Sequence, residues 1–71
     1  MKQLITFVEL EGKEYLVSTT NTFDMGLETM IFESCNQRVI SWFDLYVRHY
    51  GTVEEATEGH NEIVENIKNY I

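Results

Sequence analysis

The 71-residue sequence contains no proline and a single cysteine, Cys35. One cysteine excludes a disulfide within the chain, which fits a reducing cytoplasm and argues against a secreted scaffold held by disulfides. Long apolar runs are also missing, because the first one, after Lys2, is soon interrupted by Thr6 and Glu9. That stretch is too short and too polar for a signal peptide or a membrane span, so we expect a cytoplasmic protein.

Basic residues are scarce, with five lysines and arginines against twelve acids and a formal net charge of −7. Contacts to nucleic-acid phosphates need clustered lysine and arginine, so the charge balance argues against direct nucleic-acid binding. An acidic membrane surface would repel the chain as well. A basic protein partner, or simple solubility, remains as the interpretation of the charge.

Motifs for a metal ion or a cofactor are missing too. The sequence has no C-x-x-C pair, no H-x₃-H pair, no acidic calcium loop and no glycine-rich phosphate loop. Cys35, His49 and His60 are the only candidates for a Cys/His nucleophilic pair, which needs a thiolate held beside an imidazole. They fall in a predicted turn, at a strand end and on a helix, so we expect no catalytic residue, no cofactor and no enzyme activity.

Residues 52–71 carry the clearest local signal, that of one amphipathic helix. Thr52 and Glu55 form a capping-box pattern, in which the threonine hydroxyl accepts a backbone N–H and the glutamate reaches back to the cap. We expect His60 to be a packed core imidazole bonded to backbone or to an aromatic hydroxyl, and Gly59 to permit close approach of a neighbouring backbone. At about 100° per residue, one buried arc of about 120° holds Val53, Ala56, His60, Ile63, Val64, Ile67, Tyr70 and Ile71.

The opposite side of this helix is acidic. Glutamates that lie four residues apart place like charges next to each other, which costs about 0.2–0.5 kcal/mol for each pair. A solvated face kept soluble by charge is the simpler interpretation, and a surface shaped for a basic partner is the sharper one. The acidic side consists of Glu54, Glu55, Glu58, Glu62 and Glu65.

Four segments before the helix are rich in β-branched and aromatic residues and are separated by turn signals. Glu11 and Gly12 mark a hairpin turn, and Gly26 is free to adopt a positive φ. The chain therefore predicts one α+β domain over residues 1–71, a four-stranded antiparallel meander followed by one C-terminal amphipathic helix packed on one face (ββββα). The predicted strands are residues 2–10, 14–20, 27–34 and 39–50, the last of them bent near Asp44.

The predicted strands carry apolar residues on both sides. Since one helix covers only one face of a sheet, we expect the second face to be partly apolar and to form an interface. A homodimer through the sheet is the structural hypothesis. By alternation, Ile5 and Phe7 oppose Leu4, Val8 and Leu10, Leu16 opposes Tyr15 and Val17, and Met30 and Phe32 oppose Leu27 and Ile31.

Four large apolar residues lie at or near predicted bends. Trp42 is expected to be the central core residue under the helix, with an interface hot spot formed by Trp42 and Phe43 as the alternative. Phe23 and Met25 lie in a loop, where large apolar side chains have little core to reach, and an interface role is as compatible with this position as a structural one.

A family resemblance rests on three segments. They read E-T-M-I-F at residues 28–32, then Trp42 with Leu45, then R-H-Y-G-T-V-E-E-A-T-E-G-H at residues 48–60. This resembles the pattern of small uncharacterised proteins from phages and prophages of Gram-positive bacteria, which is E-T-M-x-F, a tryptophan, then R-Y-x-T-x-E-E-A-x-x-G-H. His49, inserted between Arg48 and Tyr50, departs from that pattern. The resemblance implies a phage accessory protein that acts in the cytoplasm of a bacterial host, and it carries over no catalytic residue.

Origin and charge together favour an inhibitor of a host defence nuclease, of the anti-CRISPR or anti-restriction kind. Carboxylates about 5–6 Å apart on a helix would replace phosphates in a basic channel, as a nucleic-acid mimic whose affinity falls with salt. The alternative is a structural or regulatory interaction module that uses the apolar sheet face, with charge serving only solubility. The residues expected to bind a partner are Glu54, Glu58, Glu62 and Glu65, with Asp24, Glu28, Phe23 and Met25 alongside.

Overall fold

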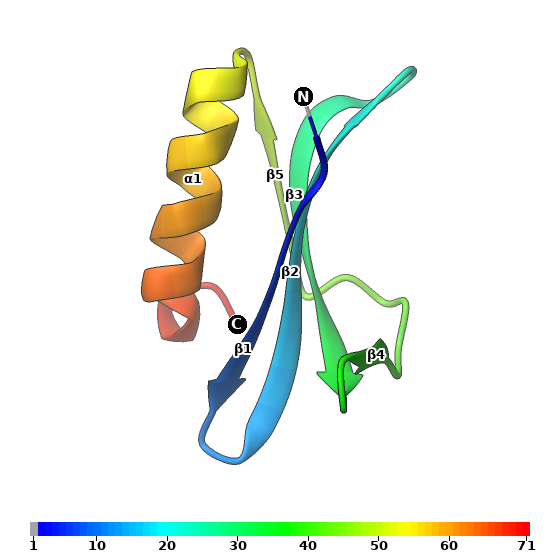
Figure 1. Ribbon diagram of the computed structural model, residues 1–71, viewed down its shortest axis with the longest axis vertical. Helices are drawn as coiled ribbons and strands as arrows, with labels where there is room; N and C mark the ends of the chain where they lie inside the picture. Colours follow the sequence, from blue (N-terminus) through cyan, green and yellow to red (C-terminus); the bar gives the residue numbers. More distant parts are fainter. Residues whose placement is uncertain (1) are drawn as a thin grey trace.

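The computed structural model describes residues 2–71. A five-stranded antiparallel sheet carries one helix on one of its faces, with β4 and β5 both paired to β3 (Figure 1). The predicted α+β fold, a meander followed by one C-terminal helix, is confirmed. The elements in chain order are β1 (Leu4–Leu10), β2 (Lys13–Thr22), β3 (Gly26–Cys35), β4 (Arg38–Val39), β5 (Tyr46–Tyr50), α1 (Val53–Glu65) and a short 3₁₀ turn, η1 (Ile67–Asn69).

Two tight turns set the register of the β1–β2 and β3–β4 hairpins. Glu11 and Gly12 both have positive φ, at 52° and 82°, which is the backbone geometry whose twist matches a two-residue hairpin. Asn36 and Gln37 repeat this geometry with φ of 52° and 63°. The predicted turn at Glu11–Gly12 is therefore confirmed, and so is the positive φ of Gly26, at 71°.

The prediction of one continuous strand over residues 39–50 is wrong. The segment divides into β4 and β5, and the residues between them form a loop. The Ile40 N–H still donates to Glu33 O at 3.0 Å, and the Leu45 N–H donates to Ile31 O at 2.8 Å. The two acceptors on β3 are thus two positions apart, whereas the two donors that bind them are five positions apart. The residues between the donors therefore have no place in the strand pairing, and they bulge out of the sheet.

The face of the sheet under α1 holds the core. Val17 and Ile31 lie opposite each other on β2 and β3, and Ile63 of α1 packs against them with no exposed surface on any of the three. Full burial of a side chain of this size contributes about 1.5–3 kcal/mol, so this cluster is a main source of stability. Partly buried side chains complete it, namely Val8, Leu10, Tyr46, Val64 and Tyr70.

Helix α1 is shorter than predicted. It ends at Glu65 because Asn66 takes the C-cap, where its backbone N–H and its side-chain amide bind the carbonyl oxygen of Glu62 at 3.0 and 3.1 Å. Val53 and Ile71 were predicted on the buried arc, but both are exposed. That part of the prediction is wrong because the two residues lie at the ends of the segment, outside the core cluster.

The N-cap of α1 is Thr52, as predicted. The Glu55 N–H donates to Thr52 Oγ1 at 3.1 Å, which satisfies one of the free backbone donors of the first turn. The Thr52 hydroxyl in turn donates to Glu55 Oε1 at 3.1 Å. The carboxylate of Glu55 therefore binds the hydroxyl of the cap rather than its backbone N–H, and both residues help to fix the start of the helix.

Candidate functional site

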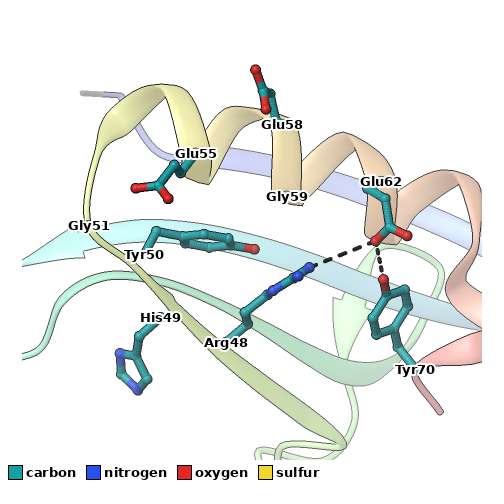
Figure 2. A pocket seen from close by; sticks show the side chains of 9 residues that line it. All are labelled: Arg48, His49, Tyr50, Gly51, Glu55, Glu58, Gly59, Glu62 and Tyr70. Carbon is teal, nitrogen blue, oxygen red and sulfur yellow. Dashed lines mark hydrogen bonds and ion pairs between the residues drawn. The ribbon is translucent and has the colours of Figure 1, made fainter.

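The acidic side of α1 faces away from the sheet. Glu54, Glu58 and Glu65 are exposed, and none of them forms an ion pair within residues 2–71. Figure 2 shows Glu58 pointing outward from the helix. Because these residues lie four and seven positions apart, they share one side of the helix, and we call them the acidic stripe. Within residues 2–71, the stripe is therefore a row of exposed carboxylates that no lysine, arginine or histidine side chain pairs with directly.

Glu62 lies on the same side of the helix, but it is engaged within the chain. Arg48 Nη1 of β5 lies 3.8 Å from Glu62 Oε2, and the Tyr70 hydroxyl donates to the same oxygen (Figure 2). The hydrogen bond to Glu62 raises the pKa of Tyr70. The Arg48 guanidinium also lies 5.8 Å from the ring centroid of Tyr50, a distance at which a cation and an aromatic face attract each other.

These residues border an open groove of about 600 Å³ between β5 and α1. Its floor is aromatic and its rim on the helix side is acidic, with Glu55 and Glu58 beside Glu62 (Figure 2). The sequence pattern predicts the glutamates of this site, but it gives no signal for the roles of Arg48, Tyr50 and Tyr70. Only the tertiary packing of β5 against the end of the chain brings those three together.

The remaining predicted contact residues do not join the acidic stripe. Phe23, Asp24 and Met25 form the β2–β3 turn, which lies away from α1 in Figure 1, and Phe23 is fully exposed. Glu28 is 8% exposed and lies on the face of the sheet opposite α1, where its Oε2 is 3.7 Å from His49 Nδ1. The structure thus separates the predicted acidic residues into a helix stripe, a turn and one buried carboxylate.

A chain of hydrogen bonds beneath α1 connects the helix to four strands. His60 Nε2 lies 2.9 Å from the Thr6 hydroxyl of β1, and His60 Nδ1 lies 2.7 Å from the Thr19 hydroxyl of β2. Thr19 is bonded to Thr29 of β3 at 2.5 Å, and Thr29 accepts from the Tyr50 hydroxyl of β5 at 3.0 Å. The network leaves no buried side-chain polar atom of residues 2–71 without a partner.

The direction of each hydrogen bond in this network follows from the Tyr50 end, where the donor is known. Since Tyr50 donates to Thr29, one consistent order has Thr29 donating to Thr19 and Thr19 donating to His60 Nδ1. The proton on His60 Nε2 is then donated to Thr6. This arrangement needs a neutral imidazole, in agreement with the effect of burial, which lowers the pKa of His60.

His60 is 3% exposed, so the prediction of a packed core imidazole is confirmed. The predicted partners, backbone or an aromatic hydroxyl, are wrong, because both ring nitrogens bond to threonine hydroxyls. Cys35 is exposed at the end of β3, seven residues beyond Glu28, the residue that His49 faces. At about 3.3 Å per strand residue, Cys35 and Glu28 are about 23 Å apart along β3, so the thiol does not lie beside this imidazole. Within residues 2–71, no three His, Cys, Asp or Glu side chains gather in a way that could hold a metal ion.

Among residues 2–71, no helix and no second sheet covers the second face of the sheet (Figure 1). Leu16 and Phe32 at its centre are nearly buried by their neighbours, whereas Ile5 is 51% exposed. The predicted division of apolar residues between the two sides of the strands is confirmed by the register. We call this surface the open face; it is formed by Ile5, Phe7, Leu16, Met30, Phe32 and Val47.

The loop between β4 and β5 borders the open face. Trp42 of this loop packs edge-on against Phe32, with ring centroids 5.2 Å apart and an interplanar angle of 68°. Trp42 nevertheless remains 74% exposed, and Phe43 is 79% exposed. The prediction of Trp42 as the central core residue under the helix is therefore wrong, because Phe32 points to the side of the sheet that α1 does not cover.

Several residues of segments 28–32 and 48–60 form one framework in the structure. Gly59 leaves room on α1 for the ring of Tyr50, whose hydroxyl reaches Thr29. Ala56 has no exposed surface, and His60 closes the hydrogen-bond network. The close approach predicted at Gly59 is present, but it is made by a side chain rather than by backbone.

Comparisons with known proteins add no relative to this picture. No protein-family model matches the chain, and neither a curated protein nor a solved structure matches it. No helix within residues 2–71 is both long and apolar enough to cross a membrane.

Proposed function

We propose that this is a non-catalytic, protein-binding accessory protein of phage type, which acts in the cytoplasm of a bacterial host. Its partner is a basic protein that binds the acidic stripe of α1. The leading specific proposal is inhibition of a host defence nuclease, either a CRISPR effector or a restriction enzyme, through this nucleic-acid-mimicking surface. The observation that carries the proposal is the row formed by Glu54, Glu58 and Glu65, exposed and without an ion pair within residues 2–71.

The acidic stripe costs the helix free energy. Glu54 and Glu58 are like charges one helical turn apart, which destabilises a helix by about 0.2–0.5 kcal/mol. Glu54 lies in the first turn, where the helix dipole compensates for it, but Glu65 is the last residue of α1. A negative charge at that end is unfavourable for folding, and it is therefore better explained by an attraction outside the chain than by helix stability.

A charge-matched pair of variants tests this proposal. The first replaces Glu54, Glu58 and Glu65 with glutamine, and the control replaces Glu9, Glu11 and Asp44 with their amides. All six side chains belong to exposed residues, and both variants lose three negative charges. We expect the stripe variant to bind the partner at least tenfold more weakly, about 1.4 kcal/mol, and the control to bind almost as well as the parent chain. Glu62 is left intact because it holds Arg48 and Tyr70 in place.

The measurement is a pull-down from lysate of a Gram-positive host, eluted along a salt gradient and identified by mass spectrometry. A nuclease that is released at moderate salt, and that the stripe variant fails to retain, would support the proposal. The recovered nuclease can then be assayed directly for inhibition. A partner that the stripe variant retains as well as the parent chain does would contradict it.

The open face favours a second candidate function. The exposed apolar side chains of Ile5 on this face and of Trp42 beside it fit a structural or regulatory interaction module in which the charge serves only solubility. Binding to such a module would change little along the same salt gradient, because burial of apolar surface is not weakened by screening. Salt dependence therefore distinguishes the two candidates.

A further inference from the structure

The open face and the acidic stripe lie on opposite sides of the molecule, because α1 covers the other face of the sheet (Figure 1). We propose that two copies of this chain associate through their open faces. The resulting dimer is a symmetric sandwich of two sheets with one α1 on each outer side. This inference goes beyond the proposed function and does not depend on it, since the acidic stripe can bind a partner from either a monomer or a dimer.

Exposed aromatic side chains beside the open face supply part of the apolar area that an interface needs. A large aromatic side chain buries about 150–250 Å², so Trp42 and Phe43, at 74% and 79% exposed, together offer on the order of 300 Å². A stable interface needs about 800 Å² from each partner. The two aromatic residues supply about a third of that area, and Ile5, Phe7 and Met30 of the adjoining strands extend the surface.

The distribution of charge favours a second copy as the occupant. Five of the twelve acids lie on α1, on the far side from the open face. On the strands of the open side, Glu9 faces Glu14 near one end and Glu28 lies beside His49 near the other, while Asp44 follows Phe43 in the bordering loop. An apolar centre with a polar margin is the usual anatomy of a protein interface.

Repulsion between two chains of net charge −7 does not prevent this arrangement. Packed sheets lie about 10 Å apart, and each α1 lies outside its own sheet. The two acidic stripes are therefore separated by more than two Debye lengths of about 8 Å at physiological ionic strength, and their repulsion is largely screened.

Sedimentation equilibrium from low to high micromolar concentration tests the dimer. It is run with a reducing agent because Cys35 is exposed. We expect the mass to rise from 8.4 kDa toward twice that value. Trp42 is the only tryptophan, so its fluorescence should shift to shorter wavelength as the dimer excludes water from it.

Two substitutions with the same chemistry locate the interface. Ile5→Glu changes the open face, and Ile71→Glu changes a residue of similar exposure, 44%, at the end of the segment that follows α1. We expect Ile5→Glu to weaken dimerisation at least tenfold and Ile71→Glu to leave it unchanged. If circular dichroism shows that Ile5→Glu does not fold, Phe43→Glu in the exposed loop replaces it with the same expectation.

Three results would overturn the inference. The first is a mass that stays at 8.4 kDa at the highest concentration. The second is a dimer that remains intact in Ile5→Glu or, if that variant does not fold, in Phe43→Glu. The third is a monomer whose Trp42 fluorescence shifts only when a different protein is added, which would assign the open face to that protein.

Discussion

Replacement of His60 by alanine is expected to lower the free energy of unfolding by about 3 kcal/mol. The substitution removes a buried side chain and leaves a cavity, and it also takes away the partner of Thr6 and one partner of Thr19. A domain of this length has a total stability on the order of 4–10 kcal/mol, so the variant should be close to unfolding at physiological temperature. Urea denaturation, followed by the fluorescence of Trp42, measures the loss.

Asn61→Ala is the matched control, because Asn61 is the exposed neighbour of His60 on the same helix. It should change the free energy of unfolding by less than about 0.5 kcal/mol. A loss of under 1 kcal/mol for His60→Ala would show that the hydrogen-bond network beneath α1 contributes little beyond the packing around it.

The same experiment repeated at several pH values tests the charge state of His60. Burial lowers the pKa of the folded imidazole below the ordinary value of 6.5, so between the two values the unfolded chain binds more protons than the folded one. The contribution of the buried neutral imidazole to the free energy of unfolding is therefore fully present above pH 6.5. It is lost as the pH falls from 6.5 through the pKa of His60 in the folded chain. For each pH unit by which the pKa of folded His60 lies below 6.5, the free energy of unfolding falls by about 1.4 kcal/mol across this range. His49→Gln should keep this dependence, and His60→Ala should lose it.

Gly59→Ala is expected to destabilise the protein by about 2 kcal/mol, although alanine is the better helix former by about 1 kcal/mol. A methyl group at this position would overlap the ring of Tyr50, lying 2.6 Å from Cζ. The ring has to move, which strains the packing and weakens the hydrogen bond from Tyr50 to Thr29. Urea denaturation of the single variant gives the loss.

The same substitution should have the opposite effect on stability in a chain that also lacks the Tyr50 ring. In a chain that carries Tyr50→Ala, the space beside Gly59 is open, so the same Gly59→Ala substitution should stabilise by about 1 kcal/mol through helix propensity alone. If Gly59→Ala stabilises the parent chain as well, the position of the Tyr50 ring does not require the absence of a side chain at residue 59.

The sequence predicts well those features that depend on neighbouring residues. The helical spacing of Ala56, His60 and Ile63 places all three in the buried layer, and Thr52 begins the helix as its cap. The acidic stripe follows from the same spacing. Likewise, strict alternation along each strand divides the apolar residues correctly between the two faces of the sheet.

Features that depend on distant partners were missed. The segment around Trp42 is apolar and aromatic, so its composition predicts a strand. Only the backbone N–H groups at its two ends, those of Ile40 and Leu45, bind carbonyl oxygens of β3. Alternation along a strand does not show which face of the sheet the helix covers, and for that reason the prediction of Trp42 under the helix is wrong. Arg48 and Tyr70 meet at Glu62 only because β5 and the end of the chain pack together.

The bond between Thr6 and His60 joins residues 54 positions apart, and it has a consequence for biosynthesis. The strands β1, β2 and β3 are neighbours in the sheet in the same order as in the sequence. They can therefore pair locally as the nascent chain leaves the ribosome. Until α1 has also emerged, however, Val17 and Ile31 have no cover and both surfaces of the young sheet remain apolar. The protein therefore completes its core in one late step after most of the chain has been made, and in the interval before it the chain is most exposed to proteases and to aggregation.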